Sequence, residues 1–161
     1  ILRRVMDAEC GFHTEPNGSD LLGLHRPTIL VDIGFDPAFQ PGNDAVPVAA
    51  ITNMPALVDT GASETYIDTA LATALGLPIV DQETVSGSAG SHTVDVYLAQ
   101  IHVPSLEQTI WGRIAGVNLI AGGQTHAALL GRTFLQYLVM HYDGPTGRVT
   151  LTGPEPPQPA A

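Results

Sequence analysis

The sequence predicts a single lobe that is mainly β, with one or two short helices. Glycine and proline are frequent, at 17 and 13 of the 161 residues, and they divide the chain into segments that suit short strands joined by turns. Several of these segments alternate apolar and polar residues with the period of a half-buried strand. A hydrophobic content of 44% is sufficient for one compact core.

The lobe is expected to span residues 28–152, preceded by an N-terminal extension of residues 1–27 that shows no clear periodicity. Three roles remain open for this extension: an edge strand, packing against a dimer, or occupation of the binding cleft. Residues 28–35 have the composition of a strand, and a second apolar strand ends at Val58.

Two segments predict helices. Residues 68–75 begin with Asp68, a typical N-cap residue, and are followed by Gly76 and Pro78, which favour termination. A shorter helix is expected over residues 133–138.

A hairpin lies within the predicted lobe, and a tail follows the lobe. Residues 84–97 contain a turn of small residues between alternating segments, which predicts a hairpin with a flexible tip. The tail, residues 153–161, is too rich in proline to join a sheet through its amides, so we expect a linker or a frayed end.

The most informative motif follows the strand that ends at Val58. It consists of Asp59, Thr60, Gly61 and Ala62, which place one carboxylate on a tight turn after a buried strand. Glycine at the third position allows the backbone N–H to approach a carboxylate oxygen, and the threonine hydroxyl can brace the turn. Taken alone, the motif also fits an ordinary polar turn.

A second motif, Leu129-Leu130-Gly131 followed by Arg132, appears about seventy residues later. In this order the two motifs resemble those of the retropepsin-like aspartic peptidases, the single-lobed family of the retroviral proteases and their cellular and bacterial relatives. The resemblance covers about residues 28–151, and it implies that residues 139–151 form a closing hairpin. It implies a closed β-barrel or sandwich lobe, in which the apolar pair and its glycine support the catalytic loop from behind.

The resemblance also implies roles for individual residues. Asp59 is the expected catalytic acid, and its loop is supported by Thr60, Gly61, Ala62, Leu129, Leu130 and Gly131. The hairpin from Val85 to Val94 matches the family's flap, which closes over bound peptide. The expected substrate-binding residues of its tip are Ser88, Ala89, Gly90, Ser91 and His92.

An aspartic peptidase requires two carboxylates that share a proton, yet the chain contains no second Asp-Thr/Ser-Gly motif. The nearest candidate, Asp32-Ile33-Gly34, lacks the hydroxyl residue and lies in a predicted strand. The second aspartate is therefore expected from another copy of the chain, in a homodimer that cleaves a peptide or protein substrate. No cofactor or metal is expected.

A formal charge of −10, with no lysine, makes nucleic acid an unlikely partner. The same charge opposes dimerisation near neutral pH. The retroviral proteases build much of their dimer interface from interleaved terminal strands. The proline-rich tail of this chain does not suit such strands, so the dimer is expected to rely on other contacts and to be weak. Two-lobed aspartic peptidases usually have serine at the position of Ala62, whereas retropepsins have alanine and work at less acidic pH, so the resemblance implies a mild optimum at about pH 4 to 6.

Other chemistries fit the sequence poorly. Its six histidines show no metal-binding spacing, and Ser63 and residues 86–91 do not form a serine-hydrolase elbow. The single Cys10 is expected to be a free thiol, and no apolar stretch is long enough to span a membrane. Localisation stays open, with the cytoplasm as the default. Two alternatives to an active peptidase remain: a non-catalytic dimerisation or peptide-binding module of the same fold, and a latent precursor.

Overall fold

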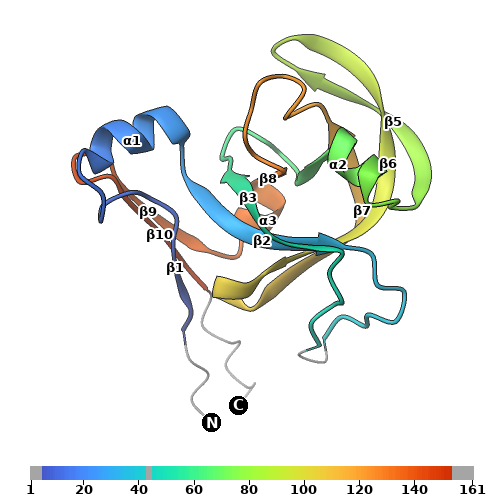
Figure 1. The fold of residues 1–161 in the computed structure, drawn as a ribbon, viewed down its shortest axis with the longest axis horizontal. Helices are drawn as coiled ribbons and strands as arrows, with labels where there is room; N and C mark the ends of the chain where they lie inside the picture. Colours follow the sequence, from blue (N-terminus) through green and yellow to red (C-terminus); the bar gives the residue numbers. More distant parts are fainter. Residues whose placement is uncertain (1–4, 43–44, 154–161) are drawn as a thin grey trace.

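The structure, a computed structural model, describes residues 5–42 and 45–153 (Figure 1). Its elements in chain order are β1 (Asp7–Glu9), α1 (Gly18–His25), β2 (Thr28–Gly34), β3 (Ile51–Val58), β4 (Tyr66–Asp68), α2 (Thr69–Ala74), β5 (Ile79–Gly87), β6 (Gly90–Val103), the 3-10 helix η1 (Pro104–Leu106), β7 (Gln108–Val117), β8 (Ala128–Leu130), α3 (Arg132–Leu135), β9 (Val139–Asp143) and β10 (Arg148–Thr152).

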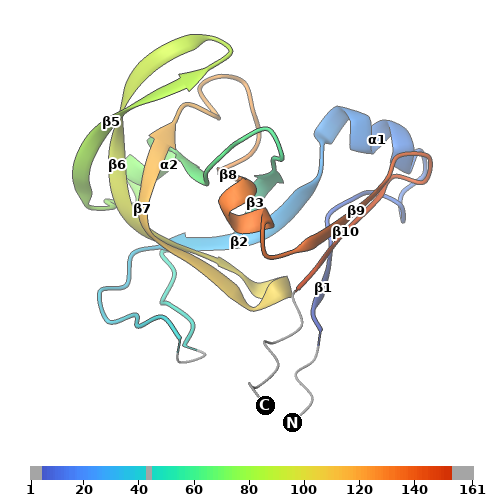
Figure 2. The same ribbon diagram turned by 180° about the vertical axis from the view of Figure 1, so that it is seen from behind.

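A seven-stranded sheet with the order β2-β3-β8-β4-β7-β6-β5 forms most of the molecule. Because β2 also pairs with β6, the strands from β2 to β6 in this order close into a barrel. The β5–β6 hairpin extends away from the barrel, as Figures 1 and 2 show. The prediction of a mainly β, closed lobe with few helices is confirmed.

The extension contributes to a second sheet, with three strands in the order β1-β10-β9. Beyond β1, the backbone N–H of Cys10 donates to the carbonyl of Val149 at 2.8 Å, and that of Phe12 donates to the carbonyl of Gly147, also at 2.8 Å. Gly11 permits this approach, because a Cβ there would lie 2.3 Å from the Gly147 oxygen. Of the roles left open for the extension, the structure shows the edge strand.

The helix α1 was not predicted from the sequence. Its apolar residues give a weak pattern, since Leu22 is 1% exposed whereas Leu24 is 72% exposed. Its N-cap, Asn17, is left-handed and makes no side-chain capping bond, so the usual start signal is also missing. Packing of Leu22 into the core explains this helix better than local propensity does.

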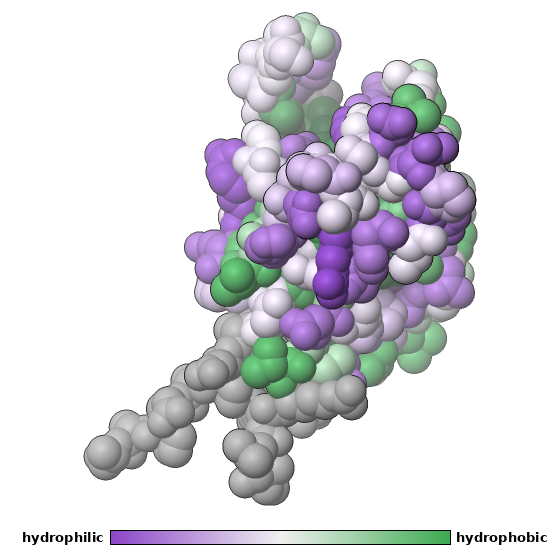
Figure 3. Space-filling view, turned by 90° about the vertical axis from the view of Figure 1, so that its left-hand side faces the viewer, coloured by the Kyte–Doolittle hydropathy of each residue, from purple (hydrophilic) through white to green (hydrophobic). Residues whose placement is uncertain are grey.

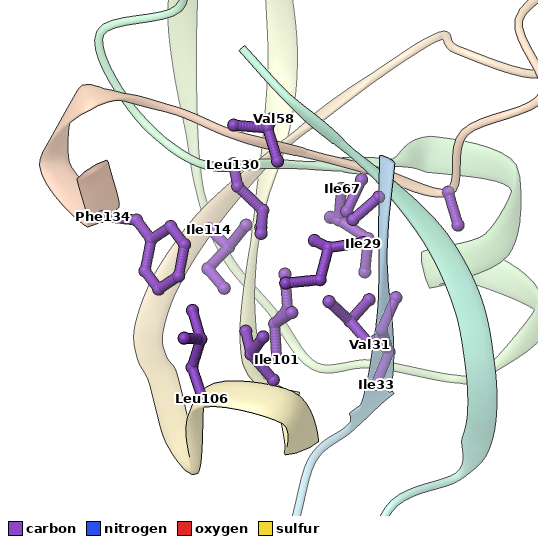
Figure 4. Packing of buried hydrophobic residues seen from close by; sticks show 14 of the residues in the cluster. Ile29, Val31, Ile33, Val58, Ile67, Ile101, Leu106, Ile114, Leu130 and Phe134 are labelled. Carbon is purple, nitrogen blue, oxygen red and sulfur yellow. The ribbon is translucent and has the colours of Figure 1, made fainter. Parts of the chain in front are cut away.

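The core fills the barrel and continues under the three-stranded sheet. Figure 4 shows residues from distant parts of the chain packed together, with Val58 and Leu130 at one end and Ile101 and Ile33 at the other. Val58 immediately precedes Asp59 of the first motif, and Leu130 immediately precedes Gly131 within the second; they are 4% and 0% exposed, respectively. Burial of these strand ends fixes the positions at which both motif turns begin.

The helix predictions were correct in place and differ in length. The Asp68 carboxylate caps α2 by accepting from the Leu71 N–H at 3.0 Å, and Gly76 beyond the helix has a φ of 64°. The second helix, α3, covers Arg132–Leu135 and so begins earlier and ends sooner than expected. The predicted closing hairpin is the β9–β10 pair. The predicted tail, except for Gly153, lies outside the described residues.

Candidate active site

Asp59 lies at the first position after β3, where the chain turns away from the barrel. The Asp59 N–H donates to the carbonyl of Leu130 at 3.0 Å, which continues the parallel pairing of β3 with β8. One carboxylate oxygen, Oδ1, accepts from the Gly61 N–H at 2.8 Å. The Asp59 side chain is half-buried, so it is held in place and remains open to a ligand.

The second motif braces this turn from behind. The Arg132 guanidinium donates to the Thr60 carbonyl at 2.9 Å, and the Arg132 backbone N–H donates to the Ala62 carbonyl at 2.9 Å. Thr133 N–H adds a bond to the carbonyl of Ser63 at 3.1 Å. Three carbonyls of the loop, those of Thr60, Ala62 and Ser63, are thereby tied to the start of α3.

Gly131 is required at its position by a close backbone approach. A Cβ on this residue would lie 2.1 Å from the Glu64 carbonyl oxygen and 2.9 Å from that of Ala62. Both are backbone atoms, so the loop after Asp59 would have to move to accommodate any side chain at position 131. The glycine of the second motif thus allows the first motif's loop to pack directly on the start of α3.

The structure brings seven of the expected site residues together at this loop. They are Asp59, Thr60, Gly61, Ala62, Leu129, Leu130 and Gly131. The remaining expected site residues, Ser88, Ala89, Gly90, Ser91 and His92, lie at the exposed tip of the β5–β6 hairpin. His92 is opposite Val85 in the ladder, and a hydroxyl pair 2.9 Å apart, Ser86 and Ser91, joins the strands near the tip.

A further carboxylate, Asp68, organises a loop that the sequence did not connect with the site. Besides capping α2, its Oδ1 accepts from the N–H groups of Leu119 and Ile120 at 3.0 and 3.1 Å. Asp68 is 1% exposed, so these charge-assisted bonds are shielded from water. They fix the loop of residues 118–127, which connects β7 to β8 and thus leads into the second motif.

Arg26 of the N-terminal extension and Thr28 of β2 hold the other end of this loop. The Arg26 guanidinium donates to the Gln124 side-chain oxygen at 3.1 Å, and the Thr28 hydroxyl lies 2.9 Å from Nε2 of His126. Figure 1 places the loop and the β5–β6 hairpin on the same side of the molecule. Sequence reasoning missed these ties, and only the capping role of Asp68 carried a local signal.

The residues considered for other chemistries are dispersed. Across the described ranges, no group of three or more His, Cys, Asp or Glu side chains is placed to hold a metal ion. The thiol of Cys10 is buried, and burial, followed by the nearby charge of Glu9, raises its pKa to about 12. Such a thiol is a poor nucleophile. None of the described helices is long and apolar enough to cross a membrane.

The sequence matches a known protein family. Residues 50–137, more than half of the chain, match the family described as "gag-polyprotein putative aspartyl protease". Among solved structures, the chain is similar to the EIAV protease complexed with the inhibitor HBY-793, with 20% sequence identity over 68% of this chain and 85% of that chain and a TM-score of 0.44. The curated proteins contain no match to the chain.

The family match begins at residue 50, just before β3, and ends at residue 137, just after α3. It therefore includes both motif turns, the β5–β6 hairpin and the loop that Asp68 holds. The chain is accordingly a member of the retropepsin-like gag-polyprotein aspartyl protease family.

Proposed function

We propose that the protein is an aspartic endopeptidase whose active site is completed by homodimerisation. The observation that carries this proposal is the position of Asp59, a half-buried carboxylate whose Oδ1 is held by the Gly61 N–H at 2.8 Å on a turn braced by Arg132. Within one chain this turn supplies a single motif carboxylate. Asp59 of a second copy would provide the partner.

In the proposed mechanism the two Asp59 carboxyl groups share one proton. The ionised group removes a proton from a water molecule as the water oxygen bonds to the peptide carbonyl carbon, while the protonated group donates a hydrogen bond to the carbonyl oxygen. The tetrahedral intermediate then collapses as a proton passes to the amide nitrogen and the C–N bond breaks. An acid and an amine are released, with no covalent enzyme intermediate.

The hairpin tip and the loop of residues 118–127 are the proposed walls of the cleft. Every residue from Gly87 to Thr93 is exposed at the hairpin tip, as expected of a segment that contacts other groups only when substrate is bound. The loop carries Ile120, which is 49% exposed and suited to an apolar substrate side chain. We propose that closure of the hairpin excludes water from the dyad.

The free edge of β9 is a candidate part of the dimer interface. β9 is the outer strand of the three-stranded sheet, and its Val139 and Tyr142 are 68% and 55% exposed. An exposed edge strand offers unpaired backbone groups to a second chain. The face that carries α1 and the β9–β10 hairpin is otherwise largely hydrophilic, with scattered apolar residues (Figure 3), which suits a weak association.

The proposal is tested by incubating a diverse peptide library with the wild-type chain and with Asp59→Asn, over several protein concentrations between about pH 4 and 7. Cuts that disappear in Asp59→Asn and rise faster than linearly with protein concentration are expected. A folded, dimeric wild-type protein that makes no Asp59-dependent cuts would instead favour a non-catalytic peptide-binding module.

A further inference from the structure

A cavity of about 460 Å³ lies between β7, α3 and the chain segment at Glu64 and Thr65. Asp59 does not line it. The deeper wall includes Phe134 and Ile114, which are 6% and 2% exposed, and both belong to the core shown in Figure 4. The cavity therefore has a fixed apolar floor.

The outer wall of the cavity is aromatic and exposed. Trp111 and Tyr137 are 56% and 63% exposed, which is unusual for such large rings. An edge-to-face contact with Phe39, at a centroid distance of 6.4 Å and an interplanar angle of 64°, holds the Trp111 ring in place. The Trp111 ring is thus available to a ligand at a reduced entropic cost.

The charges of the cavity favour a cation. Arg113 also lines it, but its guanidinium forms an ion pair with Asp81. That hydrogen bond holds the pKa of the Asp81 carboxyl below its ordinary value, so the pair stays ionised and its net charge is zero. Glu64 has no ion pair with any residue in the described parts of the chain. The uncompensated charge at the cavity is negative, on a chain whose net charge is −10.

We propose that this cavity binds an arginine side chain of an extended peptide, at a site distinct from the cleavage cleft. The guanidinium would lie against the rings of Trp111 and Tyr137 and donate to the carboxylate of Glu64, while the peptide's apolar groups contact the floor. Identification of this peptide as part of a substrate rests on the proposed peptidase function. Binding itself does not.

The cavity wall is also part of the loop that carries Asp59. The hydroxyl of Thr65 accepts from the Gly131 N–H at 3.4 Å, and the Thr133 N–H donates to the Ser63 carbonyl at 3.1 Å. A peptide held at the cavity would therefore contact the loop after Asp59 and the start of α3, which together position the Asp59 turn. This arrangement suits a second anchoring point for a long substrate.

Trp111 is the chain's single tryptophan, so its fluorescence reports directly on the cavity. The test uses the full chain carrying Asp59→Asn, which separates binding from cleavage. The blocked peptide acetyl-Ala-Ala-Arg-Ala-amide is titrated while tryptophan emission is recorded, with calorimetry in parallel. The citrulline analogue, which has the same shape without the charge, is the matched ligand control.

We expect a saturable change of Trp111 emission with the arginine peptide and at least about fivefold weaker binding of the citrulline peptide, the ratio that corresponds to ~1 kcal/mol for one cation–π contact. Glu64→Gln and Tyr137→Ala should each weaken binding of the arginine peptide by about the same factor. Glu15→Gln, which removes an equal charge from an exposed position in the extension, should leave it unchanged.

Equal binding of the two peptides, or unchanged affinity in both folded cavity variants, would overturn the proposal. Calorimetric binding without any change in tryptophan emission would place the peptide elsewhere and would also overturn it. If free arginine amide binds as tightly as the peptide, the cavity is a site for a small cation, and the proposal of a peptide site is overturned. These outcomes measure binding and do not depend on cleavage. They can therefore be interpreted even if the protein proves to have no peptidase activity.

Discussion

The carboxylate of Asp68 accepts a hydrogen bond from the backbone N–H of Leu119 at 3.0 Å, across 51 positions of sequence. The same side chain accepts from Leu71 and Ile120. One buried anion thus joins the start of α2 to the loop that leads into the second motif. Removing it would leave up to three backbone donors without a partner.

Asp68→Ala is therefore expected to lower the free energy of unfolding, by about 1–3 kcal/mol for each buried donor left unsatisfied. Chemical denaturation measures the loss, and hydrogen exchange at the Leu119 and Ile120 amides should accelerate beyond the exchange elsewhere in the barrel. Asp20→Asn, an exposed carboxylate in the first turn of α1, is the control and should cost far less. Protection of the two amides that survives in Asp68→Ala would show that the loop does not depend on this carboxylate.

Gly131→Ala tests whether the first motif depends on close packing against the second. The new Cβ would lie 2.1 Å from the Glu64 carbonyl oxygen, so the loop after Asp59 must shift. We expect a loss of stability of roughly 1–3 kcal/mol, typical of overpacking, and loss of any Asp59-dependent peptidase activity. Thermal unfolding and peptide cleavage are the measurements.

Gly23→Ala is the matched control for that substitution. Gly23 lies inside α1, and a Cβ there meets no atom within 4 Å. Alanine should stabilise the helix by up to about 1 kcal/mol. If both variants behave alike, the close approach at Gly131 does not constrain the loop.

The sequence predicted those parts of the fold that are encoded locally. The apolar strand before Asp59, the Asp68 cap and the small-residue turn of the hairpin each depend on neighbours in the chain, and each was correctly placed. The helix α1 was missed because Leu22 is its only residue in the core cluster. Its stability comes from tertiary packing, which leaves little trace in local periodicity.

The candidate site shows the same division. The two motifs could be found from residue types, because a turn carboxylate and a close-packed glycine are constrained wherever they occur. The bonds from Asp68 to Leu119 and from Arg26 to Gln124 link positions 51 and 98 residues apart, and nothing in the local sequence indicates these pairings. Long-range hydrogen bonds of this kind follow from the closed barrel.

Leu22→Ala tests whether the extension belongs to the folded unit. Leu22 is 1% exposed and lies in the core cluster, so truncation is expected to cost about 2–5 kcal/mol. Leu24→Ala, in the same helix at 72% exposure, should change stability little. Thermal unfolding distinguishes the two. A negligible cost for Leu22→Ala would instead favour a detachable extension, as the latent-precursor alternative requires.

His126 predicts a loss of stability in mild acid. Thr28 donates its hydroxyl proton to the Arg26 carbonyl at 3.0 Å, so at its 2.9 Å contact with Nε2 of His126 it acts as the acceptor. The proton of the neutral ring therefore lies on Nε2, and Nδ1 is buried without a partner among the described residues. Burial, followed by the positive charges of Arg26 and His25, lowers the pKa of His126 below its ordinary value of 6.5.

Because the folded pKa is lower than the unfolded one, the contribution of His126 to stability is complete above pH 6.5 and is lost as the pH falls from there through the folded pKa. His126→Gln can still donate to Thr28 but does not titrate, so its free energy of unfolding should fall less than that of the wild type between about pH 7 and 5. An NMR titration of the ring gives the native pKa directly. A value at or above 6.5, or identical pH dependence in the two proteins, would refute this account of His126.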